Sequence, residues 1–366
     1  MIPKEDIERI VKDYGEDAKI GTLCSHSALQ IFHGAKQEGF KTVGICTKER
    51  MHMYNSFPRA KPDEFIVVDK FSDALKEEFQ EKLRKEKVIM IPHGSFVEYV
   101  GPENIEERFR VPLFGNRETL EWEGNREKQR EWLLGAGLKM PKSFNDPSEI
   151  SNRVFVKFSG ARGGRGFFIA DSEKEFREKL AGKVSEGTIS AADAERASIQ
   201  EFMSGVRYYL HFFYSPFEEA EDTESAGRVE FLGADKRIEV IDEAYRGLPD
   251  VPEGFFDYTV TGNLPVVIRE SLMPEIMRMG EEVVKESRRL FDPGMIGAFC
   301  LETMYHPKEG FRVFEISARI VAGTNLYPEG SPYSSYLFGE PMSTGRRIAR
   351  EIKTGIKNGR LQEIVY

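Results

Sequence analysis

The chain has 366 residues, of which 40% are hydrophobic and 31% charged, and its formal net charge is −9. This length allows roughly two or three domains, the lack of a long apolar run excludes a membrane protein, and the negative charge argues against general nucleic-acid binding. The charged N-terminal segment, residues 1–17, lacks the apolar core of a secretory signal, so we expect a cytoplasmic protein.

The first third of the chain alternates predicted strands with predicted helices, which is typical of a parallel sheet. Strands are expected at residues 19–23, 42–47, 65–68 and 88–92, and helices at 29–39 and 72–86.

Two polar groups directly follow strands of this predicted sheet. Residues 25–27, with His26, come after the first strand, and residues 93–95, with Ser95, come after the fourth. Ligands of parallel sheets bind beyond the carboxyl ends of the strands, so His26 and Ser95 are candidate substrate ligands. A helix cap formed by serine beside a hydrogen-bonded histidine explains either group equally well.

A polar helix is expected from residue 118 to residue 135, closed by two glycines. It reads as a connector between domains. Its basic side chains, Arg126, Lys128 and Arg130, fit a solvated helix face better than a ligand contact.

The densest motif is RVFVKFSGARGGRGFFIA at residues 153–170, a predicted hairpin with a glycine-rich loop. Glycines let backbone N–H groups approach an anion, and cationic side chains neutralise phosphate oxygens. The residues concerned are Lys157, Arg162, Gly163, Gly164, Arg165 and Gly166. A strand rather than a helix follows, which excludes a Walker loop and a dinucleotide fingerprint and favours a flap over a nucleotide. A hairpin tip without a ligand is the alternative.

The middle of the chain predicts a mostly antiparallel arrangement. Helices are expected at 172–180, where Ser172 and Glu175 form a capping-box signature, and at 191–196; strands are expected at 198–203, 207–216 and 229–234, the last leading into residues 235–239. A turn at 261–263 places Asn263 where polar groups meet a bound molecule. A helix at 273–290 should cover the last sheet.

Residues 297–319 predict two strands joined by a turn at 307–310. If the turn is symmetric, His306 faces Phe311, and counting back sets Glu302 opposite Glu315. Facing carboxylates repel unless a cation joins them, and hard oxygen ligands suit Mg²⁺ or Mn²⁺. Two unrelated glutamates on a wet sheet face remain the alternative.

Strand alternation extends this face beyond the glutamates. Ser317 and Arg319 follow Glu315 at a spacing of two, so we expect both within reach of a transferred phosphate. The carboxylate pair and the glycine-rich hairpin together indicate an ATP site with a metal between phosphate and protein.

At this point the sequence resembles the ATP-grasp superfamily, and within it most closely the archaeal 5-formaminoimidazole-4-carboxamide ribonucleotide synthetases. The similarity covers nearly the whole chain and rests on these stretches in order: SHSALQIFHGAK, IPHGSF, VPLFGN, VKFSGARGGRGFFIA, LGADKR, TGNLPVVIRESL, GMIGAFCL, FEISAR and GRRIAREIK.

This resemblance implies an α/β and α+β chain, with an ATP-grasp fold after an N-terminal Rossmann-like domain. The expected division is a substrate domain at 1–116, a connector at 117–150, a small subdomain with the flap at 151–205 and a large subdomain with the metal site at 206–366. It also implies a homo-oligomer.

The implied reaction is the ligation of formate to the 5-amino group of aminoimidazole carboxamide ribonucleotide through formyl phosphate, with ATP cleaved to ADP and phosphate, a late step towards IMP. By resemblance, His26, Ser95 and Asn263 contact the ribonucleotide. Glu239 and the region from Lys157 to Met203, including Glu201 and Phe202, hold ATP. Glu302 and Glu315 bind Mg²⁺ or Mn²⁺, while Arg162 and Arg165, together with Lys157, stabilise charge on the phosphate.

Three positions depart from the family pattern near the expected substrate pocket. Val321-Ala322 stands where members of the family carry Asp-Gly, and Gln30 and Ile238 also differ. These departures leave open a related carboxylate–amine ligase with another substrate. A purine-nucleotide sensor without turnover is a further alternative, which the retention of both glutamates disfavours.

Overall fold

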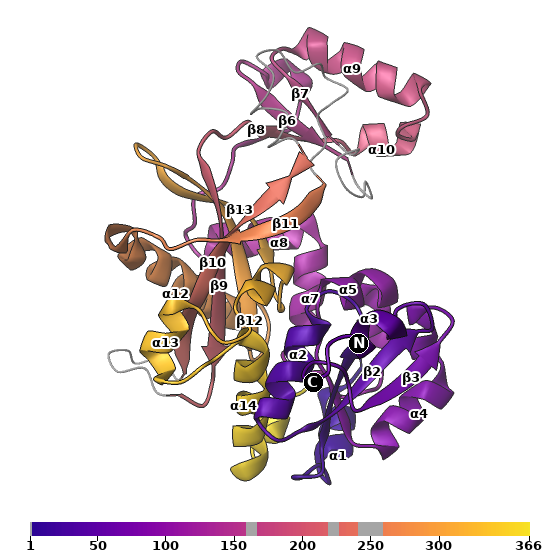
Figure 1. The fold of residues 1–366 in the computed structure, drawn as a ribbon. Helices are drawn as coiled ribbons and strands as arrows, with labels where there is room; N and C mark the ends of the chain where they lie inside the picture. The colour runs from indigo at the N-terminus through magenta and orange to yellow at the C-terminus, as the bar shows by residue number, and fades with distance from the viewer. Residues whose placement is uncertain (1, 159–166, 219–226, 241–258) are drawn as a thin grey trace.

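The computed structural model describes residues 2–158, 167–218, 227–240 and 259–366, and Figure 1 shows its parts stacked one above another. The described strands form a parallel sheet near the N-terminus, a five-stranded sheet in the middle and a small sheet at the far end (Figure 1). In these ranges every helix is too short or too polar to cross a membrane.

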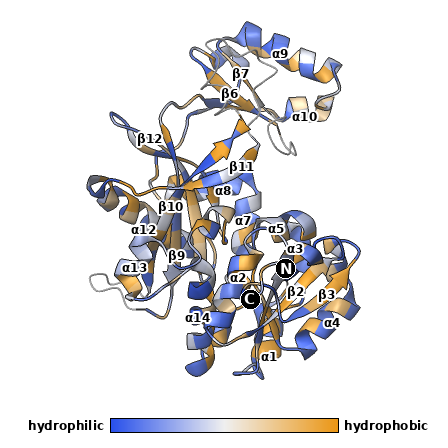
Figure 2. Cartoon of the chain, in the orientation of Figure 1, coloured by the Kyte–Doolittle hydropathy of each residue, from blue (hydrophilic) through white to orange (hydrophobic). Residues whose placement is uncertain are grey.

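The N-terminal sheet is parallel, in the order β3-β2-β1-β4, as the alternation predicts. Its elements are α1 (Lys4–Val11), β1 (Lys19–Leu23), α2 (Ala28–Gln37), β2 (Lys41–Thr47), α3 (Met51–Asn55), β3 (Glu64–Val68), α4 (Glu77–Lys85), β4 (Val88–Met90), α5 (Gly94–Val100) and α6 (Pro102–Glu107). Figure 2 shows largely hydrophobic strands beside the hydrophilic α4. The burial of the strand side chains holds this layer together.

Two predicted helices differ from the structure for local reasons. The helix expected at 72–86 starts as a separate turn at Phe71–Leu75, and the extended Lys76 divides that turn from α4. The connector is two helices, α7 (Glu118–Gly124) and α8 (Arg126–Gly135), because Asn125 is extended. The Asn125 side chain accepts from the N–H groups of Glu127 and Lys128 at 3.0 and 3.1 Å, which caps α8.

The small sheet has the order β5-β8-β6-β7 and is antiparallel throughout. Its strands are β5 (Ser143–Phe144), β6 (Val154–Lys157), β7 (Phe167–Ala170) and β8 (Ser198–Glu201), with α9 (Glu173–Ser185) and α10 (Ala191–Glu195) alongside. The pairing of β6 with β7 confirms the predicted hairpin. Its loop, 159–166, lies outside the described residues, and so do Arg162, Gly163, Gly164, Arg165 and Gly166.

The start of α9 matches only half of the predicted capping box. Ser172 accepts from the Glu175 N–H at 3.3 Å, but the Glu175 carboxylate accepts from the N–H of Asp171 at 2.7 Å rather than from Ser172. The helix also runs further than predicted, to Ser185.

The large sheet is antiparallel in the order β11-β10-β9-β12-β13. It contains β9 (Val206–Ser215), β10 (Arg228–Glu239), β11 (Val260–Pro265), β12 (Gly297–His306) and β13 (Gly310–Ser317). The expected turn at 261–263 is wrong, because these residues belong to the edge strand β11, where Asn263 pairs with Arg237. The predicted helix at 273–290 is confirmed as α12 (Met273–Leu290) and packs against the apolar side of this sheet.

The C-terminal segment returns to the N-terminal sheet after α13 (Pro332–Phe338) and α14 (Thr344–Lys357). Leu113 and Tyr366 exchange two backbone hydrogen bonds of 2.9 Å, and the Gly115 N–H donates to the Ile364 carbonyl at 2.9 Å. The chain termini therefore lie near each other (Figure 1), and both ends contribute to one core.

Candidate active site

Glu302 and Glu315 lie directly opposite each other on β12 and β13, as predicted. The reason differs from the predicted one, because His306 pairs with Gly310 and not with Phe311. A β-bulge between Glu302 and Thr303 shifts the register by one residue and brings the two glutamates back into line.

Arg237 of β10 neutralises one of these glutamates. Its guanidinium donates to both carboxylate oxygens of Glu302, at 2.8 and 3.2 Å, and Ser317 Oγ lies 3.5 Å from Glu302 Oε1. The guanidinium carbon also lies 3.7 Å from the ring centroid of Tyr209. Glu302 is buried, so a fixed cation at this position offsets the cost of removing its charge from water.

Glu315 has no comparable fixed partner among the described residues. Loss of hydration, followed by the charge of Glu302, raises its pKa to about 7, while the charges of Lys157 and Arg237 oppose the shift. The Glu315 side chain is exposed to solvent, so loss of hydration contributes little. We therefore attribute the raised pKa of Glu315 mainly to the charge of the facing Glu302. A cation placed between the two carboxylates would relieve this repulsion.

Lys157, the last residue of β6, lies close to this carboxylate pair. Its Nζ lies 5.9 Å from the ring centroid of Phe314, the neighbour of Glu315. Burial lowers the pKa of Lys157, and the charge of Glu315 opposes that shift. The predicted phosphate-binding lysine and the predicted metal ligands are therefore in one place.

Of the other residues expected to hold the nucleotide, Glu239 lies on β10 of the large sheet and Glu201 on β8 of the small sheet, and both accept hydrogen bonds from the protein. Glu239 is buried and accepts a hydrogen bond from Arg207. Glu201 accepts from Arg312 at 2.7 Å and from the Lys142 N–H at 3.2 Å, while Phe202 is exposed and Met203 half-buried. Their role towards ATP stays a prediction.

His26 and Ser95 lie at neighbouring strand ends of the N-terminal sheet. Ser25 Oγ donates to Ser95 Oγ at 2.9 Å, and Arg50 donates to Ser25 Oγ at 2.9 Å. His26 is exposed, whereas Ser95 is buried. The two polar groups predicted after the first and fourth strands are therefore in contact through Ser25 and Ser95. Arg50 adds a positive charge to this cluster.

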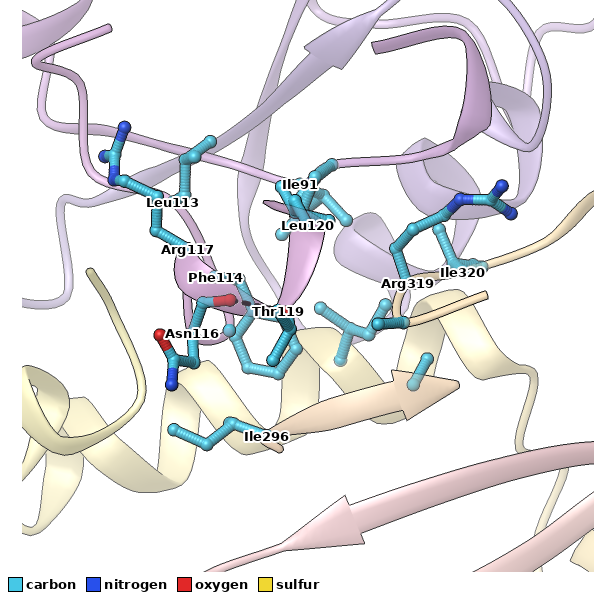
Figure 3. A pocket seen from close by; sticks show the side chains of 15 residues that line it. Ile91, Leu113, Phe114, Asn116, Arg117, Thr119, Leu120, Ile296, Arg319 and Ile320 are labelled. Atoms are coloured by element: carbon cyan, nitrogen blue, oxygen red, sulfur yellow. Dashed lines mark hydrogen bonds between the residues drawn. The ribbon is translucent and has the colours of Figure 1, made fainter. Parts of the chain in front are cut away.

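Arg319 connects this polar group with the large sheet. Its guanidinium pairs with Glu123 at 2.9 Å and lies over Gly94, where an added Cβ would come within 3.4 Å of it. Figure 3 shows Arg319 at the edge of a small cavity whose lining also includes Ile91 and Ile296. Arg319 follows the end of β13, so its position comes from the link to Glu123 and not from strand alternation.

Sequence reasoning missed several polar residues on the large sheet. Asp235 accepts from His211 Nε2 at 2.6 Å and from Asn263 Nδ2 at 2.7 Å, so Asn263 belongs to a buried network. Polar residues two apart on a strand share one face of the sheet, and this spacing could have revealed the network. It occurs at Arg207, Tyr209 and His211 on β9, and at Asp235, Arg237 and Glu239 on β10.

The departures from the family pattern lie close to this network. Gln30 Nε2 donates to Thr324 Oγ1 at 2.5 Å, and a Cβ added at Gly323 would lie 2.0 Å from Asp235 Oδ1. Val321 directly precedes the short turn at Ala322–Leu326 that contains these residues. The turn therefore lies between α2 of the N-terminal half and Asn263 of the large sheet.

The two glutamates can bind a hard divalent cation only if water or a bound substrate supplies the remaining oxygen ligands. Among the described residues, no cluster of three or more His, Cys, Asp or Glu side chains is arranged to hold a metal ion. Two facing carboxylates supply part of a coordination shell, and Mg²⁺ typically completes such a shell with water and substrate phosphates.

Comparison with known proteins identifies relatives over the whole length of the chain. Family models described as "Protein of unknown function (DUF1246)" and "Domain of unknown function (DUF1297)" match residues 20–144 and 175–366. A 5-formaminoimidazole-4-carboxamide-1-(beta)-D-ribofuranosyl 5'-monophosphate synthetase of Korarchaeum cryptofilum is 55% identical over 368 residues, covering 100% of both chains. The protein of the same name from Methanosarcina acetivorans is 50% identical over 371 residues, again with 100% coverage of both.

Solved structures give the same fold. The IMP biosynthesis protein PurP of Thermococcus kodakaraensis has 32% identity and a TM-score of 0.72, covering 95% of this chain and 100% of that one. The ADP complex of an N5-carboxyaminoimidazole ribonucleotide synthetase has 14% identity and a TM-score of 0.62, covering 92% and 77%, which shows the fold alone.

These similarities settle the choice that the sequence left open. Relatives at 44–55% identity over essentially their full length carry one synthetase name, so neither a sensor without turnover nor a carboxylate–amine ligase with another substrate is favoured. The chain has the ATP-grasp fold that its resemblance to the superfamily implies. It belongs to the family of 5-formaminoimidazole-4-carboxamide ribonucleotide synthetases, which are ligases.

Proposed function

We propose that the chain formylates the 5-amino group of aminoimidazole carboxamide ribonucleotide, consuming formate and ATP and releasing ADP and phosphate. The observation that carries this proposal is the facing pair Glu302 and Glu315 beside Lys157, in a chain 55% identical to a named synthetase. Two carboxylates and a lysine supply positioning and charge neutralisation, which phosphoryl transfer mainly requires.

In the first step, a formate oxygen attacks the γ-phosphorus of ATP, and ADP leaves with the electrons of the broken P–O bond. Lys157 faces the side of the site that holds Glu315 and is suited to binding phosphate oxygens. Arg319 is the described arginine proposed to stabilise the phosphate charge. Arg162 and Arg165 are proposed for the same task, but lie outside the described residues.

In the second step, the substrate amine attacks the carbonyl carbon of formyl phosphate, phosphate leaves, and the amine loses a proton. His26, Ser95 and Asn263 are proposed to hold the ribonucleotide during this attack. Glu201, Phe202, Met203 and Glu239 are proposed to hold the nucleotide. Glu302 and Glu315 would hold Mg²⁺ or Mn²⁺, which supplies charge neutralisation at the phosphates.

The test is ADP release by the purified protein with each substrate omitted in turn. We expect release only when ATP, formate and the ribonucleotide are all present, together with formation of the formamido product. ADP release that is unaffected by omitting formate, or by omitting the ribonucleotide, would contradict the proposal.

We further propose that the chain divides into domains after residues 116, 150 and 205. We also propose that the protein is cytoplasmic and forms a closed homo-oligomer. The return of the C-terminal segment to the N-terminal sheet adds residues 361–366 to the first of these units. Light scattering during gel filtration measures the oligomeric state, and a monomer at all concentrations would contradict that part.

A further inference from the structure

Glu123 is a nearly buried carboxylate near the C-terminal end of α7, in the region that the sequence predicts to be a connector. Its side chain is 12% exposed. One carboxylate oxygen, Oε2, accepts from the N–H of Ala318 at 2.8 Å, and the other, Oε1, lies 2.9 Å from Nη2 of Arg319. A single carboxylate therefore holds both the main chain just before Arg319 and the guanidinium of Arg319 itself.

The main chain on the other side of Arg319 is also held in place. Ile320 forms a parallel β-bridge with His93, and the guanidinium of Arg319 lies over Gly94, where an added Cβ would come within 3.4 Å of it. Gly94 directly precedes Ser95, which is proposed to hold the ribonucleotide. Arg319 therefore lies between this serine of the N-terminal half and β13, the strand that ends two residues before it and carries one of the two facing glutamates.

The guanidinium of Arg319 keeps hydrogen-bond donors for a ligand. An arginine side chain has five N–H donors in a fixed planar fork, and Glu123 contacts the Nη2 end of this fork. The side chain of Arg319 is 17% exposed, and Figure 3 shows its guanidinium turned away from the apolar side chains that line the small cavity. A guanidinium that is held at one end and open at another is suited to binding a phosphate.

The carboxylate of Glu123 is not needed to join α7 to the large sheet. Gln129 Nε2 already donates to the main-chain carbonyl of Glu123 and to that of Ile316, each at 3.1 Å. Burial raises the pKa of Glu123 although the charge of Arg319 opposes the shift, so keeping this carboxylate ionised costs free energy. A buried ion pair of this kind is weak evidence for a stabilising role, and perturbed carboxylates cluster at functional sites.

We propose that Glu123 is the positioning residue for Arg319, and that its carboxylate turns the guanidinium so that the free N–H donors meet the transferred phosphate. This inference rests on the proposed function. Both partners of Glu123 are donors, the N–H of Ala318 and an N–H of Arg319, so both carboxylate oxygens are required. A glutamine offers one acceptor oxygen and one NH₂ donor, and can therefore serve only one of the two partners.

The experiment compares steady-state ADP formation by the wild type and by Glu123→Gln, with formate and the ribonucleotide at saturation. We expect Glu123→Gln to lower kcat at least about 10-fold, because a displacement of about 1 Å can cost about 100-fold in rate. The KM for ATP should change less than about 3-fold, because the lost interaction acts in the transition state. A kcat within about 3-fold of the wild-type value would overturn the inference.

A double variant tests whether Glu123 acts through Arg319. Residues that work as a unit show losses that do not add, so Arg319→Gln should have a kcat within about 3-fold of that of Arg319→Gln combined with Glu123→Gln. Losses that add would place the action of Glu123 elsewhere and contradict the inference. Arg319→Gln also keeps the inference falsifiable if Glu123→Gln does not fold, because a kcat of Arg319→Gln within about 3-fold of the wild-type value would leave Glu123 nothing to position.

Glu123→Asp separates the charge of the side chain from its shape. It keeps both acceptor oxygens on a side chain that is one methylene shorter, whereas Glu123→Gln keeps the length and loses the charge. We expect Glu123→Asp to keep a kcat at least about 3-fold above that of Glu123→Gln, and the reverse order would point to a packing role instead. Glu121→Gln, which removes the partner of Lys128 on the same helix, is the matched control and should keep the wild-type kcat.

The proposed function and this inference can fail separately. A wild type that forms ADP, with a Glu123→Gln variant equally active, would overturn the positioning role alone. A wild type that forms no ADP with formate and the ribonucleotide would overturn the proposed function, and crystal structures of the wild type and Glu123→Gln then decide the inference. A guanidinium of Arg319 displaced from Gly94 in the variant would support the positioning role, and an unmoved guanidinium would end it.

Discussion

His93 illustrates how one buried side chain is held in a single protonation state. Its Nε2 lies 2.9 Å from the Leu23 carbonyl, and its Nδ1 accepts from the Phe96 N–H at 3.2 Å. Burial lowers the pKa of His93 to about 4. The sequence offered a serine cap beside a hydrogen-bonded histidine as an alternative to a ligand site; in the structure His93 itself caps α5.

The first prediction concerns the stability of the protein in acid. Between about pH 4 and pH 6.5 the unfolded chain binds a proton at His93 that the folded protein does not, so stability rises with pH across this window and falls on acidification. The contribution is about 3 kcal/mol over the whole window. His93→Asn keeps an N-cap acceptor but does not titrate, so urea unfolding from pH 4.5 to 7 should show a smaller slope.

The matched control for that experiment is His26→Asn, which removes the exposed histidine of the same region. It should leave the pH dependence of unfolding close to that of the wild type. An unchanged slope in His93→Asn would mean that His93 is not the group responsible.

The second prediction concerns the metal. Glu315→Gln removes one carboxylate of the facing pair while Arg237 keeps its partner Glu302, so the fold should persist. We expect Mn²⁺ affinity in the presence of ATP, measured by electron paramagnetic resonance, to fall at least about 10-fold, the size of effect that even outer-shell changes produce.

Glu282→Gln, a change on the surface of α12, is the control for this metal experiment. It should bind Mn²⁺ as the wild type does. Wild-type Mn²⁺ affinity and ADP formation in Glu315→Gln would remove Glu315 from the metal site.

At the scale of secondary structure, α14 is fastened to the large sheet by buried charges. Arg347 donates to Glu230 at 2.8 Å and to Glu351 at 2.7 Å, and Ser215 Oγ donates to Glu351 at 2.7 Å. The guanidinium carbon lies 4.4 Å from the ring centroid of Phe213. One cation therefore serves two buried carboxylates.

The third prediction follows from this network. Arg347→Leu leaves Glu351 buried without its cation and Glu230 with Arg228 alone, so the free energy of unfolding should fall by about 3–5 kcal/mol in chemical denaturation. Lys357→Ala, on the exposed end of the same helix, should change it by less than about 0.5 kcal/mol. A loss below about 1 kcal/mol in Arg347→Leu would contradict the prediction, because it would mean that the carboxylates become hydrated or protonated with little change in free energy.

Elements with strong periodicity were predictable from the sequence, and those set by a single side chain were not. The 3.6-residue pattern and Pro274 define α12, whose predicted limits agree with the structure. The break at Asn125 depends on one side chain accepting two backbone hydrogen bonds, which competes with a continuous helical pattern. The sequence predicts a turn at Asn263 because Gly and Asn are common in turns and depleted in strands, and the pairing with β10 overrides this local preference.

For the whole molecule, the sequence predicts the parts better than their connections. The parallel N-terminal sheet, the β6–β7 hairpin and the glutamate pair follow from local patterns. The network of Asp235, His211 and Asn263 joins three strands that are distant in sequence, and only the folded chain shows it. The return of the C-terminal segment also depends on long-range pairing.

The fourth prediction tests that return. Arg117 is buried and donates to the Tyr366 carbonyl at 2.9 Å, and the side chains of Leu361, Ile364 and Val365 are buried. Removal of residues 361–366 should therefore lower the melting temperature by at least about 10 °C, since each large buried aliphatic side chain contributes about 1.5–3 kcal/mol. Gln362→Ala, an exposed change in the same segment, is the control, and a truncated chain that melts like the wild type would contradict the prediction.

The bulge beside Glu302 has a consequence for how this molecule tolerates insertions and deletions. The turn between β12 and β13 is one residue out of step with a symmetric turn, and the bulge at Phe314 absorbs the difference before the strands reach Glu315. Deletion of Phe314 alone should remove the bulge and leave Glu315 opposite Glu302, whereas deletion of a second residue between Gly310 and Glu315 would have no bulge to absorb it and should turn Glu315 to the opposite side of the sheet. The pairing of the two glutamates can therefore survive the loss of one residue from this hairpin during evolution.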